Sequence, residues 1–168
     1  ESIERMGDPK LLLTSYVVWA LADSGFKGKE LQTSIDFIRT EVKKANNAYI
    51  LALAANALAA WDANDDSTLE VLKKLATFKQ LSKEDNKVLM FPAGGQSLSY
   101  GRGDSMTVET TALAAMAMLK TKQFSSDATK ALMYLVKAKD AHGTWGSTQA
   151  TILALKALVM GAGGAPQK

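Results

Sequence analysis

The 168-residue chain contains no cysteine, and this absence excludes several kinds of site at once. Without cysteine, these residues form no disulfide, no zinc site with thiolate ligands and no cysteine nucleophile. Proline and histidine are also scarce, with three and one residues respectively. Few prolines leave long stretches free to be helical, and a lone His142 does not make a metal cluster or a catalytic dyad. The composition therefore excludes cysteine-based sites and any metal cluster or catalytic dyad built around His142.

A long apolar run and a strong excess of one charge are lacking as well. The longest apolar stretch, residues 49–61, is interrupted by Asn56 and is shorter than the roughly 20 residues that a membrane span needs. The charged residues 1–5 contain no apolar signal core, so we expect no targeting segment in this stretch. The net charge is +3, but lysines alternate with acids, as in residues 41–44. This pattern favours a solvated surface over a binding site for a polyanion.

Alanine and leucine are abundant, and they favour helices throughout the chain. Two kinds of helical segment alternate. Four segments are apolar nearly all round: residues 11–22, 48–63, 107–120 and 148–160. Three segments between them have one apolar and one charged face: residues 29–44, 69–81 and the helix that starts near residues 125–127. This alternation predicts an all-α fold of about seven helices in inner and outer layers, which is an α/α toroid or part of one. An open solenoid of helical repeats is the competing architecture.

Capping residues and glycines indicate where these helices begin and end. Asp8 and Pro9 form a good helix start, and we expect Asp66 and Ser67 to cap the fourth helix, with Ser67 and Glu70 as a capping box. Ser125, Ser126 and Asp127 are expected to cap the sixth helix. Residues 82–106 read as a loop inserted into a single domain, or domain fragment, that spans residues 1–168. Within the loop, residues 88–91 form either a short strand or a packed loop.

The turn before the last apolar helix carries the most distinctive composition. Gly143 and Gly146 permit backbone angles that other residues avoid, Trp145 supplies a large apolar anchor, and Ser147 or Thr148 caps the helix that follows. If all inner helices run the same way, the turns before them lie on one rim: residues 46–48, 103–107 and 144–148. Helix N-termini present unpaired amide donors there.

Four motifs, in order, resemble the thioester-containing domain of the alpha-2-macroglobulin and complement thioester protein family. Residues 142–151 read His-Gly-Thr-Trp-Gly-Ser-Thr-Gln-Ala-Thr, which is similar to that family's Gly-aromatic-Gly-Ser-Thr-Gln-x-Thr signature. Residues 13–18, 49–58 and 108–113 resemble three inner helices of the same domain. The family's Cys-Gly-Glu-Gln thioester sequence lies upstream of all four motifs, as does the histidine that assists transfer in some members, to which His142 does not correspond. The resemblance therefore implies the C-terminal part of a thioester domain without its reactive centre.

This resemblance implies a scaffold and not an enzyme, with no cofactor and no catalytic, cofactor-binding or metal-binding residues in this chain. The parent protein would trap proteases as an endopeptidase inhibitor, or tag targets covalently, and it would be secreted or periplasmic. Its implied partners are the remaining half of the domain, the neighbouring macroglobulin domains and, through the parent, proteases. We expect Glu109, Trp145, Thr148 and Gln149 to support the rim that carries the thioester. A partial toroid leaves an apolar edge uncovered, so we also expect self-association through the first and last inner helices.

Two other classes of function stay open at this point. A toroidal glycosidase or lyase would use rim carboxylates, for which Asp104, Glu109 and Asp140 are the candidates, and a helical-repeat binding module would need no chemistry. Residues 139–145 resemble the Gln-Trp repeat of triterpene cyclases, and residues 62–66 are the nearest acidic motif, although helix capping explains these acids more simply. Glu109 likewise reads as a first-turn acid favoured by the helix dipole. Arg102-Gly103-Asp104 matches the integrin-binding tripeptide, a motif short enough to arise by chance.

Overall fold

The computed structural model describes residues 8–92 and 105–163, whose regular structure is helical apart from one short hairpin. The apolar helices are α2 (Pro9–Asp23), α4 (Ala48–Trp61), α6 (Ser105–Thr121) and α8 (Thr148–Gly163). The amphipathic helices are α3 (Glu30–Glu41), which continues into the 3-10 helix η1 (Val42–Lys44), α5 (Asp66–Ala76) and α7 (Ser125–Ala138). Strand β1 (Gln80–Leu81) pairs antiparallel with β2 (Leu89–Met90).

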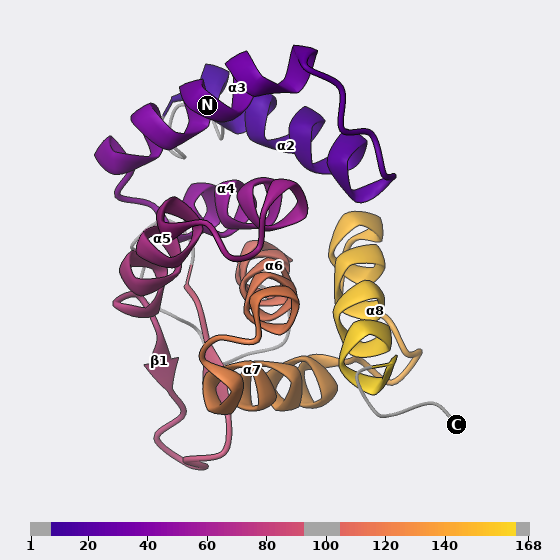
Figure 1. The fold of residues 1–168 in the computed structure, drawn as a ribbon. Coiled ribbons are helices and arrows are strands. Elements are labelled where there is room, and N and C mark those ends of the chain that lie inside the picture. The colour runs from indigo at the N-terminus through magenta and orange to yellow at the C-terminus, as the bar shows by residue number, and fades with distance from the viewer. Residues whose placement is uncertain (1–7, 93–104, 164–168) are drawn as a thin grey trace.

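The helices form two layers, as the alternation predicts. Each inner helix packs against the next inner helix, α2 on α4, α4 on α6 and α6 on α8, and each also contacts the outer helix that follows it in the chain. The outer helices α3, α5 and α7 lie around α4 and α6 (Figure 1). The chain is therefore an all-α arc of an α/α toroid, and the predicted fold class is confirmed.

The two central inner helices are enclosed on all sides. Every residue of 50–60 in α4 and of 107–118 in α6 is buried. Alanines make up much of both helices and allow close approach of the backbones, so that one polar side chain fits between them. The Asn56 amide donates to the Ala52 carbonyl of α4 and to the Leu113 carbonyl of α6, both at 2.8 Å. Nearer the start of both helices, the charge of Glu109 on α6 acts on Tyr49, the second residue of α4, so the N-termini of α4 and α6 lie at the same end.

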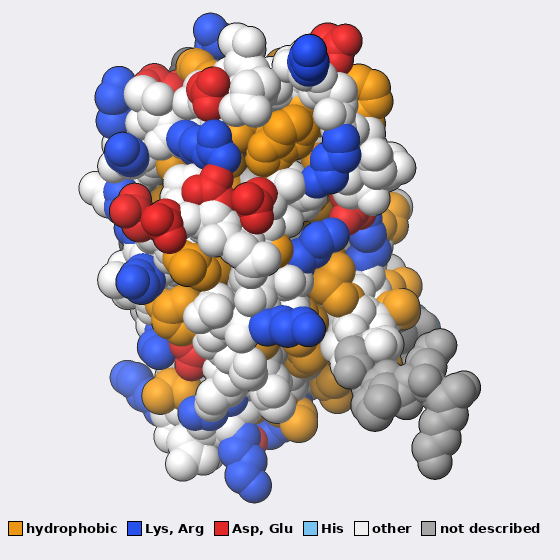
Figure 2. Space-filling model, viewed as in Figure 1, with side chains coloured by type: hydrophobic (Ala, Val, Ile, Leu, Met, Phe, Trp, Pro, Cys, Tyr) orange, Lys and Arg blue, Asp and Glu red, His pale blue; other side chains and the backbone are white. Residues whose placement is uncertain are grey.

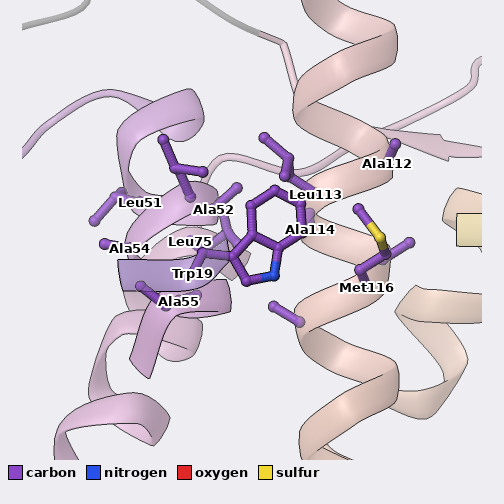
Figure 3. Close-up of a cluster of buried hydrophobic side chains, with 14 of the residues drawn as sticks. Trp19, Leu51, Ala52, Ala54, Ala55, Leu75, Ala112, Leu113, Ala114 and Met116 are labelled. Atoms are coloured by element: carbon purple, nitrogen blue, oxygen red, sulfur yellow. The ribbon is translucent and has the colours of Figure 1, made fainter. Parts of the chain in front are cut away.

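Trp19 of α2 completes this core from one side. Figure 3 shows its indole between Ala52 and Ala55 of α4 and Leu113 and Ala114 of α6. The ammonium of Lys156, on α8, lies 5.0 Å from the centre of the indole ring, so the first and last inner helices approach each other at this point. Only 9% of Trp19 remains exposed.

The two end helices of the arc are buried on one face only. On α2 the exposed face is apolar and follows helical spacing, with Leu13 65%, Val17 46% and Leu21 40% exposed. On α8, Ile152 and Val159 are 48% and 70% exposed. These exposed faces agree with the uncovered apolar edge expected of a partial toroid, because no further inner helix lies beside α2 or α8 in the described part of the chain.

Two of the expected helix caps are wrong. Helix α5 is capped by Asp65, not by Asp66 or Ser67, because the Asp65 carboxylate accepts a hydrogen bond from the Ser67 amide at 3.0 Å. Ser67 is therefore inside the helix and is not the N-cap that a capping box with Glu70 requires. Helix α7 begins at Ser125 after Phe124, whose left-handed backbone makes the turn without a side-chain cap. The caps at Asp8 and Asn47 are formed as their residue types predict.

The hairpin begins before the region expected as a loop: β1 takes the place of the end of the helix expected over residues 69–81, and only β2 lies within residues 82–106. Phe91, directly after β2, is fully buried, and its amide donates to the Thr111 hydroxyl of α6 at 3.0 Å. This agrees with the strand alternative for residues 88–91. Residues 93–104, which include the Arg-Gly-Asp tripeptide and Asp104, lie outside the described residues.

The surface viewed in Figure 2 carries lysine and arginine side chains spread over all of its height, with acidic side chains between them. This arrangement fits the solvated surface expected from the alternating charges. Among the described helices, none is long and apolar enough to cross a membrane.

Candidate rim site

The turn between α7 and α8 is built around Trp145. Its indole nitrogen donates to the Leu135 carbonyl at 2.7 Å, and only 3% of the residue is exposed. Leu135 is in the last turn of α7, where carbonyls have no partner within the helix, so the tryptophan satisfies one of them. The Trp145 amide in turn donates to the Thr151 hydroxyl of α8 at 3.0 Å. Trp145 therefore joins the end of one helix to the start of the next.

Asp140 holds the first half of the same turn. Its carboxylate accepts from the Thr144 hydroxyl at 2.6 Å, from the Thr144 amide at 2.9 Å and from the His142 amide at 2.8 Å. These hydrogen bonds, above all those from Thr144, hold the pKa of Asp140 below its usual range. Gly143 closes the turn with a positive φ of 80°. The Asp140 carboxylate thus has a structural role in this turn, and His142 is exposed.

The second half of the turn lies against the start of α6. Gly146 has a φ of 92°, and a Cβ at this position would lie 3.2 Å from the Ser105 hydroxyl. Ser147 caps α8, since its hydroxyl accepts from the Ala150 amide at 3.0 Å. With α4 and α6 starting at the same end, the N-termini of three inner helices form one rim. Of the turns expected there, residues 103–104 lie outside the described part of the chain.

Glu109 is the buried acid of this rim. It is 9% exposed, and burial raises the pKa of its carboxyl above the usual range. Helix α6 begins at Ser105, so Glu109 lies beyond the first turn, and the interpretation as a first-turn acid favoured by the helix dipole is wrong. The expectation placed the helix start too late because residues 105–107 resemble the end of a polar loop. Within the described residues, no hydrogen bond or ion pair reaches the Glu109 carboxylate.

Two tyrosines accompany Glu109, and the sequence alone did not single them out. Burial raises the pKa of Tyr49 to about 12, with further contributions from the charges of Glu109 and Tyr16. Tyr49 is the second residue of α4 and Tyr16 lies on α2, so this polar group joins three inner helices. The available signal was the aromatic residue two positions after the cap Asn47.

Replacing the Glu109 carboxylate is expected to stabilise the fold at neutral pH. A raised native pKa means that the folded state binds the proton more tightly, so stability falls as pH rises from the unfolded pKa, about 4.5, through the native one. Glu109→Gln should therefore raise the free energy of unfolding by about 1 kcal/mol at pH 7. Near pH 3.5 the two proteins should be equally stable, as measured by urea denaturation. As a control, Glu84→Gln at an exposed acid should leave the free energy of unfolding unchanged at both pH values. A Glu109→Gln protein that is less stable than the unmodified chain at pH 7 would contradict this account.

Thr148 and Gln149 are exposed in the first turn of α8. Of the four residues expected to support the rim, Trp145 and Glu109 are thus buried within it and Thr148 and Gln149 face outward from it. The support itself stays a prediction, because it concerns groups that these residues would contact outside the described chain.

The acidic motif of residues 62–66 caps a helix and forms no separate site. Asp62 and Asp65 of the acidic motif accept from nearby amides at the start of α5, and Asp65 also pairs with Arg39. The first cause of the lowered pKa of Asp65 is the hydrogen bond from the Ser67 amide. In residues 8–92 and 105–163, no group of three or more histidine or acidic side chains is placed to hold a metal ion.

The sequence of this chain has counterparts in known proteins. The family model of the A-macroglobulin TED domain, the thioester-containing domain, matches residues 2–160. The chain is 31% identical over 160 residues to Complement C3 of Naja naja and 27% identical over 159 residues to A.superbus venom factor 2 of Austrelaps superbus. It is 29% identical over 160 residues to the Venom factor of Crotalus adamanteus. Each alignment covers 90% of this chain and 8% of the relative, so the chain spans a small part of these proteins. With a family match over nearly its whole length and the predicted alternation of helices in place, the chain belongs to the A-macroglobulin TED domain family.

Proposed function

We propose that residues 1–168 are the C-terminal scaffold part of a thioester domain in a larger A-macroglobulin-like protein. The observation that carries this proposal is the pair of exposed apolar faces on α2 and α8, at the two ends of the arc. Solvent-exposed stripes of this kind are unusual on a complete domain, and further inner helices would cover both. The missing half of the domain, which in this family carries the Cys-Gly-Glu-Gln sequence, is the expected partner.

In this role the chain shields and positions the thioester and performs no acyl transfer itself. It has no cysteine, so the thioester would be formed by a preceding segment. The parent protein would trap proteases or tag targets covalently, together with its neighbouring macroglobulin domains. Its relatives include proteins named as complement and venom factors, which supports a secreted or periplasmic location for the parent.

The rim formed by the N-termini of α4, α6 and α8 is the proposed support for the thioester. Trp145 fixes the turn before α8, and Glu109 and Tyr49 place buried polar groups behind the rim. Thr148 and Gln149, exposed in the first turn of α8, would donate hydrogen bonds to the segment that carries the thioester.

The test is made in the parent protein. Gln149→Ala together with Thr148→Ala should speed hydrolysis of the thioester about 30-fold, since each of the two lost hydrogen bonds is worth about 1 kcal/mol. The readout is the rate at which a free thiol appears without any activating cleavage. Gln32→Ala, at an exposed glutamine of the outer helix α3, is the matched control and should leave this rate unchanged. A parent without an upstream Cys-Gly-Glu-Gln, or an equally stable thioester in the double variant, would overturn the proposal.

A further inference from the structure

A hollow of about 190 Å³ opens between the outer helices α3 and α5, beside the first turn of α4. Its apolar wall is formed by Val42, Leu51 and Val71, from η1, α4 and α5 respectively. We call it the α3–α5 hollow. Sites for drug-sized molecules occupy about 300–1,000 Å³, so this hollow suits a single apolar side chain instead.

Cationic side chains surround the mouth of the α3–α5 hollow. Arg39, Lys43 and Lys74 line it, against a single acid, Glu70. Arg39 is already paired with Asp65 and Asp36. The Lys74 ammonium donates only to the Lys43 carbonyl, at 3.1 Å, and in the described residues no carboxylate pairs with the exposed Lys43. Because an ammonium has three donors, both lysines keep hydrogen-bonding capacity for an anionic group.

The next gap along the outer layer shows what fills such a space. Between α5 and α7 lies the hairpin of β1 and β2, whose strand β2 packs against α6 and α7 (Figure 1). Leu89 and Phe91 of this extended segment are fully buried. Near them, the Asp85 carboxylate accepts from the Lys137 ammonium of α7 at 2.6 Å, and this hydrogen bond lowers the pKa of Asp85. An extended segment with apolar side chains and a carboxylate therefore closes the gap between two outer helices.

The α3–α5 hollow offers the same chemistry without a segment of the described chain to fill it. We propose that it binds an extended acidic peptide segment of another protein or domain, with one apolar side chain against Leu51 and Val71. A carboxylate beside that side chain would accept from Lys43 and Lys74. The hollow lies on the outer layer, so this site is independent of the proposed thioester scaffold and stands whether or not that proposal holds.

The chain of 168 residues is suitable for the test, with the blocked pentapeptide Glu-Asp-Leu-Asp-Glu as the probe. In a titration followed by amide chemical shifts, we expect saturable changes centred on Val42, Leu51 and Val71, with a Kd of about 1 mM or below. Replacing the central leucine by alanine should weaken binding about tenfold, and replacing the four acids by lysine should abolish it. No saturable change, or changes centred elsewhere on the surface, would overturn the proposal.

Reversing charges in the protein distinguishes binding in the α3–α5 hollow from general attraction of the acidic peptide to a positively charged surface. Lys43→Glu with Lys74→Glu should weaken binding of the acidic pentapeptide at least about tenfold. The matched control is Lys73→Glu with Lys83→Glu, which makes the same change of charge at exposed lysines outside the α3–α5 hollow. Equal weakening by both pairs would show attraction to net charge only and would refute the site. The amide spectrum of each variant reports whether its fold is intact.

Discussion

Trp145→Ala is expected to lower the free energy of unfolding by about 3–5 kcal/mol, the range for removing a buried tryptophan. The side chain is 3% exposed and its indole nitrogen satisfies the Leu135 carbonyl, so the variant loses packing and leaves a buried carbonyl without its donor. Stabilities of whole domains are about 5–15 kcal/mol, so this single change removes a large share. The melting temperature should fall by about 10 °C or more for a chain of this length. Urea denaturation followed by circular dichroism measures the change.

Two further variants identify the cause of this loss. Trp145→Phe keeps most of the apolar contact but has no donor for Leu135, so it should cost about 1–2 kcal/mol. Trp61→Ala makes the same truncation at a half-buried tryptophan at the end of α4 and should cost clearly less than Trp145→Ala. If the free energy of unfolding of the Trp145→Ala variant lies within about 1 kcal/mol of that of the unmodified chain, the turn does not depend on Trp145.

The sequence predicts the helices of this fold well because burial follows a simple period. Helices that are apolar all round and helices with one charged face are distinguishable by periodicity alone, and their alternation predicts both layers. The helix starts are less predictable. Phe124 makes its turn with a left-handed backbone, and nothing in its chemistry favours that conformation over the serine cap one residue later. At α5, three adjacent polar residues compete as caps, and the contact of Asp65 with Arg39 from α3 favours the first of them.

The rim could be predicted in part. Its turn has a distinctive sequence, with two glycines around Trp145, and the structure places both glycines at positive φ. The environment of Glu109 depends on where α6 begins and on which side chains α2 and α4 place beside it. Tyr16 and Tyr49 are far from Glu109 in the sequence, and only the packing of three helices brings them together. Long-range neighbours of this kind have no local signal.

The exposed apolar faces of α2 and α8 lead to the second large effect, which concerns association. Alone in solution, the 168-residue chain is expected to self-associate, because Leu13, Val17 and Val159 are each about half or more exposed to water. Burying three such side chains contributes about 1 kcal/mol each, so replacing all three by glutamate should raise the dissociation constant at least about 100-fold. Sedimentation velocity over a concentration series would detect the shift to monomer.

The matched control is Met133→Glu with Val136→Glu, on the outer helix α7, where the side chains are 39% and 49% exposed. These positions are apolar and exposed to a similar degree, but they lie outside the two end faces of the arc. If association arises from surface hydrophobicity in general, this pair weakens it as well, and the end faces have no special role. If only the α2 and α8 substitutions release the monomer, the uncovered ends of the arc are the surfaces that associate. Both sets replace exposed side chains, for which stability changes of about 0.5 kcal/mol or less are usual, so a loss of association would not reflect unfolding.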